Sequence, residues 1–141
     1  MIYKPNNFEL YELLPRKFYH DYKYRGDSLW YLFDDRLLKT LDELREKFGK
    51  TFINTWNWGG KREYSGWRPS DCEVGALFSQ HKFGRACDCI FQDHKAQDVR
   101  AWIIDNKNEK IFKYITGMEM EIPWLHIDVR NYDGLLLFKK V

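Results

Sequence analysis

The chain has 141 residues, which is enough for one domain with a buried core, and 18% of its residues are aromatic. Its 23 basic and 21 acidic residues leave a net charge of +2, which gives no electrostatic argument for a nucleic-acid partner. No run of about eighteen apolar residues occurs, so we expect no membrane span.

The cysteines and the N-terminus indicate a compartment. Three cysteines, an odd number, argue against a disulfide framework and favour a reducing environment. The first residues, Met1 to Asn7, lack the apolar core of a signal peptide. We therefore expect a cytoplasmic protein, or one that waits in the host cytoplasm if a phage encodes it.

The first third of the chain is predicted to be helical. Residues 7–14 favour a short helix that ends before Pro15. Ser28 is a plausible N-cap for a longer helix that ends at Gly49. Apolar residues recur within it at helical spacing: Leu29, Leu32, Phe33, Leu37, Leu41, Leu44 and Phe48. We expect this amphipathic helix to pack against the core.

The rest of the chain predicts strands around one long loop and one helix. Residues 51–55 and 87–91 favour strands, and 93–106 favour a helix. The loop over 56–76 is rich in Gly, Ser, Pro and aromatic residues. Further strands are predicted over 114–121, 125–129 and 135–138, with a hairpin turn at Asp133-Gly134. The order predicts a single α+β domain over 1–141, with an antiparallel sheet flanked by helices.

Two histidines and one aspartate in this region form a candidate ligand set: His81, Asp88 and His126. Two imidazoles and a carboxylate suit Zn²⁺ with one position left open, and an open position is typical of hydrolytic sites. Mn²⁺ and Co²⁺ remain alternatives. Cys87 and Cys89 flank Asp88, but in a strand they point to the opposite face, which makes the aspartate the better ligand.

The residues around these ligands resemble a known family. The pattern S-x-H-x-x-G-x-A-x-D over Ser79–Asp88, followed by W-x-H-x-D over Trp124–Asp128, is similar to the zinc D-Ala-D-Ala carboxypeptidases and L-Ala-D-Glu endopeptidases. The segment from Tyr64 to Pro69 looks like that family's S-G-[YW]-R segment. The resemblance runs from about Phe52 to Phe138. It implies a hedgehog/DD-peptidase-like fold with a zinc site on the sheet face, in a phage-endolysin-like member.

The resemblance also implies roles for residues near the metal. Arg68 matches an arginine that faces the scissile amide, and its guanidinium would hold a substrate carboxylate or the developing oxyanion. Ser79 would hydrogen-bond the substrate backbone, or alternatively cap a turn. Trp67 and Trp124 would line the substrate groove, although both also suit a core.

The general base is where the sequence departs from the family. Several members carry Glu three residues before the last ligand histidine, and here that position is Pro123, which cannot transfer a proton. Glu119 is the first candidate to replace it, followed by Glu121 and then Asp128. Asp128 alternatively orients His126 from behind.

The resemblance implies a zinc-dependent peptidase that hydrolyses an amide bond in peptidoglycan stem peptides, in a phage or bacterial lytic enzyme. Without a signal peptide, such an enzyme would reach the wall after a separate protein permeabilises the membrane, or as part of a phage particle. Two alternatives stay open. One is a non-catalytic peptidoglycan- or protein-binding module, and the other is a cytoplasmic D-Ala-D-Ala-type dipeptidase.

Overall fold

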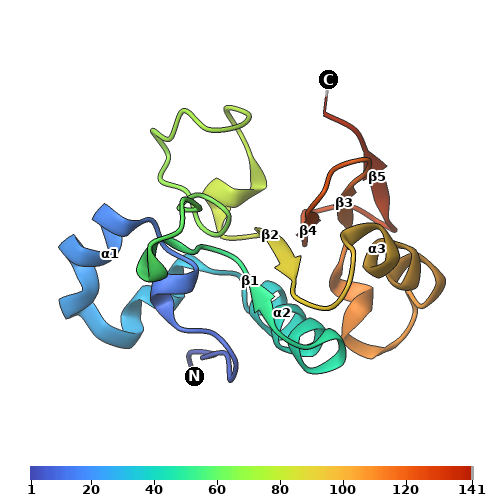
Figure 1. The fold of residues 1–141 in the computed structure, drawn as a ribbon, viewed down its shortest axis with the longest axis horizontal. Helices are drawn as coiled ribbons and strands as arrows, with labels where there is room; N and C mark the ends of the chain where they lie inside the picture. The colour runs from blue at the N-terminus through green and yellow to red at the C-terminus, as the bar shows by residue number, and fades with distance from the viewer. Residues whose placement is uncertain (141) are drawn as a thin grey trace.

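The computed structural model describes residues 1–140 and places a five-stranded sheet at the centre of a mixed α+β fold (Figure 1). The strands are β1 (Thr51–Phe52), β2 (Ala86–Phe91), β3 (Gly117–Glu119), β4 (Leu125–Asp128) and β5 (Leu136–Phe138). Their order is β1-β2-β4-β3-β5, and all neighbours are antiparallel except β3 and β5. The α+β class expected from the sequence is confirmed.

Helices and 3₁₀ segments precede the sheet and connect its strands. The α-helices are α1 (Arg16–Tyr22), α2 (Asp35–Phe48) and α3 (Ala96–Asp105). Short 3₁₀ segments cover Leu10–Glu12, Lys23–Leu32, Trp56–Trp58, Gln80–Phe83 and Lys110–Tyr114. Within residues 1–140, none of the helices has the length and apolar character needed to cross a bilayer.

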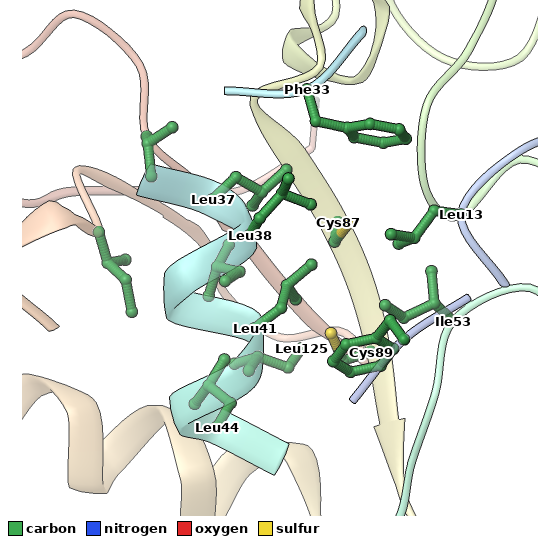
Figure 2. Packing of buried hydrophobic residues seen from close by; sticks show 14 of the residues in the cluster. Leu13, Phe33, Leu37, Leu38, Leu41, Leu44, Ile53, Cys87, Cys89 and Leu125 are labelled. Carbon is green, nitrogen blue, oxygen red and sulfur yellow. The ribbon is translucent and has the colours of Figure 1, made fainter. Parts of the chain in front are cut away.

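The core lies between α2 and one face of the sheet (Figure 2). Leu37, Leu41 and Leu44 of α2 belong to the same core as Cys87 and Cys89 of β2, and all five are fully buried. Because side chains alternate along a strand, the residues between these cysteines face the other way. The sheet therefore has one apolar face covered by helix and one face left for polar groups.

The long helix expected from Ser28 begins later than predicted. Residues 23–32 form a 3₁₀ segment, and Phe33 is extended (φ −117°, ψ 142°). The α-helix starts after Asp34, whose carboxylate accepts a hydrogen bond from the Arg36 amide at 2.9 Å. The Ser28 hydroxyl instead donates to the Arg25 carbonyl. Asp34 is thus the effective N-cap, since it satisfies an amide that the helix leaves free.

The hairpin expected at Asp133-Gly134 does not form. Strand β4 already pairs with β2 on one side and β3 on the other, so neither of its edges is open to the next strand. Strand β5 instead pairs in parallel with the outer edge of β3. Gly134 still adopts a positive φ of 101°, so the Asp-Gly signal marks a turn within the connection but does not set the pairing.

Candidate metal centre

The polar face of the sheet carries three chemically active side chains in one cross-strand row. His126 on β4 pairs in register with Asp88 on β2 and with Glu119 on β3. Residues paired in this way point to the same face of the sheet. The row therefore brings two carboxylates to either side of one imidazole, on the face opposite the core.

His81 reaches this row from the 3₁₀ turn that precedes β2. The Ser79 hydroxyl accepts a hydrogen bond from the His81 amide at 3.3 Å and caps the turn. Gly84 ends the turn in the left-handed region with φ 66°, a conformation that suits glycine. The chain then enters β2 directly, so His81 lies over Asp88.

His81, Asp88 and His126 form a buried group that could hold a metal ion. Each offers one ligand atom, and these atoms lie within 4.8 Å of one another. Two imidazole nitrogens and one carboxylate oxygen are donors that Zn²⁺ accepts, and three protein ligands leave a coordination position open. The donor set therefore fits the metal expected from the sequence.

Each histidine has a hydrogen-bond partner for one ring nitrogen, and its other ring nitrogen faces Asp88. His81 donates from Nδ1 to the Gly66 carbonyl at 2.8 Å, which leaves Nε2 at 3.3 Å from Asp88 Oδ1. His126 Nδ1 lies 2.8 Å from the same Oδ1, and its Nε2 lies 2.9 Å from Asp128 Oδ2. Partners of this kind fix the ring orientation and tautomer of histidine ligands.

The surroundings of His81, Asp88 and His126 shift the pKa of each of these side chains. Burial lowers the pKa of His81, and the attraction of Asp88 does not offset it. Burial also acts to lower the pKa of His126, but hydrogen bonds to Asp128 and Asp88 outweigh it and raise that pKa to about 9. Burial would raise the pKa of Asp88, yet the two histidines hold it well below its usual range. Without metal, a proton on His126 therefore lies against Asp88.

The metal group lies in a cleft with a volume of about 830 Å³. The side chains lining the cleft are Arg68, Val74, Ala76, Phe78, Ser79, Gln80, His81, Asp88, Glu119, Ile122, Trp124, His126, Arg130, Phe138 and Lys140, together with Gly75. Phe78 is 74% exposed and, with Val74, forms an apolar part of the cleft lining. The cleft thus combines a polar floor with apolar walls, as binding sites for organic ligands commonly do.

No family model, no curated protein and no solved structure matches this chain. Inference about its function therefore rests on the geometry of the metal group and its cleft. The family likeness described from the sequence stays a prediction.

Arg68 connects the long loop to the metal group. It donates from Nε to the Tyr64 carbonyl at 2.7 Å and from Nη1 to the Val74 carbonyl at 3.3 Å. Its Nη2 lies 3.6 Å from Asp88 Oδ2. The guanidinium is mostly buried, and it is held in the cleft beside the metal group.

The three candidate bases lie in different surroundings. Glu119 lines the cleft next to His126. Glu121 is exposed and pairs with Lys139 at 2.9 Å, away from the cleft lining. Asp128 is fully buried behind His126 and accepts hydrogen bonds from Arg130 at 2.7 and 2.6 Å. Burial would raise the Asp128 pKa, but Arg130 and His126 lower it to about 2.

Of the two tryptophans expected to line the substrate groove, one lines the cleft and the other does not. Trp124 lines the cleft as expected for a groove wall. Trp67 instead packs on Phe18, with ring centroids 4.5 Å apart, and is not among the residues that line the cleft. The "S-G-[YW]-R" tryptophan thus anchors the loop to the N-terminal segment.

The cleft residues that the sequence did not predict include Arg130, Phe138 and Lys140 on the β5 side. Phe138 pairs in register with Glu119, so the cross-strand row ends on β5 with an aromatic ring. A signal was available in the spacing, since Phe138 and Lys140 are two residues apart, and in an extended chain such residues point to the same side. Using that signal required knowing that β5 lies beside β3.

Proposed function

We propose that this chain is a zinc-dependent peptidase that hydrolyses an amide bond in peptidoglycan stem peptides. The observation that carries the proposal is a three-ligand group on the floor of a cleft, with a carboxylate in the cleft lining, Glu119, in register with a ligand histidine. A bound Zn²⁺ would lower the pKa of a coordinated water and polarise a carbonyl.

The chain's own residues supply the proton transfers. Glu119 would accept a proton from the attacking water and deliver it to the leaving amine, which keeps the protons in balance. Arg68 would face the carbonyl oxygen as negative charge develops on it, since its Nη2 already lies near Asp88 at the cleft floor. Trp124 and Ser79 would line the path of the peptide.

The metal site and the proton carrier can be tested separately. Purified zinc-loaded protein should release peptide fragments from isolated peptidoglycan, and mass spectrometry of the fragments would identify the bond cut. His81→Ala should abolish both zinc retention and release. Glu119→Gln should keep the zinc and slow release roughly 100- to 10,000-fold.

Glu121→Gln is the matched control. It removes the same charge two residues away, from a side chain paired with Lys139 outside the cleft. We expect this variant to retain wild-type activity. Absence of peptide release by the zinc-loaded wild type would contradict the proposal, and an active Glu119→Gln variant would contradict the role of Glu119.

A non-catalytic binding module is the second candidate, and Pro123 favours it. Proline stands where the resembled family places its catalytic Glu, and it lines a separate hollow beside α3 with Arg100 and Ile122. Tight binding of a stem peptide by the zinc-loaded wild type, without fragment release, would support this candidate over the peptidase.

A further inference from the structure

Counted with Asp128, the three cations and three carboxylates at the metal cleft balance one another before a metal binds. Arg68, Arg130 and Lys140 are cationic, whereas Asp88 and Glu119 are the acidic residues of the lining. Arg68 is matched by Asp88, and Arg130 is matched by Asp128 beneath it. A divalent metal would add two further positive charges. The cleft is thus suited to a ligand that brings negative charge.

Arg130 is held rigidly at the β5 side of this cleft. Its Nε and Nη2 donate to the two oxygens of Asp128, and its guanidinium carbon lies 4.7 Å from the centre of the Phe138 ring. Within residues 1–140, its Nη1 makes no hydrogen bond. A fixed guanidinium with free N–H groups is well suited to bind a carboxylate.

Lys140 adds a second cation at the same side. It lies two residues beyond Phe138, lines the cleft and is exposed. Among the residues that the structure describes, no carboxylate lies within 4.0 Å of its amine. The neighbouring Lys139 points elsewhere and pairs with Glu121 at 2.9 Å. Of these adjacent lysines, only Lys140 offers its charge to the cleft.

The two cations belong to the part of the cleft next to Phe138, whose ring lies beside the ligand residue His126. The rings of Phe138 and His126 have centroids 5.6 Å apart, and Arg130 stacks on Phe138. An extended peptide advances by roughly 3.3 Å per residue, so the 5.6 Å between the rings of His126 and Phe138 corresponds to about two residues of a bound peptide. A peptide substrate would therefore reach both places at once.

We propose that Arg130 and Lys140 form a subsite for a substrate carboxylate, and that the preferred substrates are acidic peptides with a free carboxylate within about two residues of the scissile amide. This inference rests on the proposed peptidase function. The subsite would bind the carboxylate by charge and by hydrogen bonds, and it would discriminate against the uncharged carboxamide of the same shape.

Isothermal titration of zinc-loaded protein with two peptides tests the subsite. The peptides are L-Ala-γ-D-Glu-L-Lys with its C-terminal carboxylate amidated, and the same amidated tripeptide with the α-carboxylate of its D-Glu also converted to a carboxamide. We expect wild type to bind the carboxylate form about tenfold more tightly, as one charged hydrogen-bonded contact would give. Lys140→Gln should reduce this preference to below about threefold, and Lys140→Arg should keep it.

Lys139→Gln is the matched control, because it removes the same charge from the adjacent residue outside the cleft. It should bind both peptides as wild type does. Equal affinity of wild type for the two peptides, no binding of either, or an unchanged preference in Lys140→Gln would overturn the subsite.

Cleavage of the same peptides separates the subsite from the peptidase function. A carboxylate preference in binding without any cleavage supports the subsite and contradicts the peptidase. Cleavage of both peptides, together with equal binding affinity for the two, contradicts the subsite and supports the peptidase.

Discussion

Gly117→Ala should weaken zinc binding although residue 117 does not touch the metal group. Gly117 is buried on β3 in register with Asp128, and a Cβ there would lie 2.6 Å from Asp128 Cγ and closer still to Oδ1. The Asp128 carboxylate cannot move freely, because it is fully buried and bonded to both His126 and Arg130. The added methyl must displace it.

The expected loss of zinc affinity follows from the contact between Asp128 and His126. Displacing Asp128 loosens the hydrogen bond that orients His126, and loss of such a partner typically weakens metal affinity about 10- to 100-fold. That range corresponds to about 1.4–2.8 kcal/mol of binding free energy. The crowding itself should lower the free energy of unfolding of the metal-free protein by about 1–3 kcal/mol.

Competition for zinc against a chromophoric chelator measures the affinity, and urea denaturation measures the stability. Gly49→Ala is the control, since Gly49 follows α2, has a φ of 83° and has open space around its Cα. This variant should lose about 1–3 kcal/mol of stability through backbone strain while keeping its zinc affinity. A Gly117→Ala variant with wild-type zinc affinity would refute the positioning role of Asp128.

Three further predictions address the core, the thiols and the site. Asp42→Ala should lower the free energy of unfolding, measured in urea, by about 3 kcal/mol, because the buried carboxylate accepts hydrogen bonds from one hydroxyl and three amide groups of the N-terminal segment. A loss below about 0.5 kcal/mol would contradict this. Cys72 alone should react rapidly with a thiol reagent, since Cys87 and Cys89 are fully buried and burial raises the pKa of both thiols. Rapid reaction of more than one thiol would contradict the buried positions of Cys87 and Cys89. Zinc binding at about pH 7.5 should release about one proton, because His126, with its pKa raised to about 9, must lose its proton to coordinate. Titration in buffers of different ionisation enthalpy measures that number, and the apparent affinity should rise with pH up to about 9.

Local patterns account for part of the ligand group, although Asp88 and His126 are 38 positions apart in the chain. Asp88 and His126 lie on strands whose alternation is visible in the sequence, and alternation alone separates Asp88 from its flanking cysteines. The start of α2 was less predictable, because Ser28 and Asp34 both suit an N-cap. Only packing decided that the chain between them forms a 3₁₀ segment.

The cationic side of the cleft could not be predicted, because it depends on strand order. An Asp-Gly turn favours a hairpin, yet β4 has no free edge, and β5 passes to β3. That crossover places Phe138 beside Glu119 and brings Lys140 to the cleft. Which edge of a sheet is open depends on residues far apart in the chain, and no local pattern records it.

The same strand order gives a physical account of Pro123. Arg100 on α3 donates to the carbonyls of Ile122 and Trp124 at 3.0 and 2.8 Å and so fixes the turn between β3 and β4. Held in this way, position 123 lines the hollow beside α3 and is absent from the lining of the metal cleft. Glu119 lies on a strand in register with His126, where its position follows from backbone pairing and not from a turn. A carboxylate carried by β3 can therefore serve the metal cleft while the turn, with its proline, serves packing against α3.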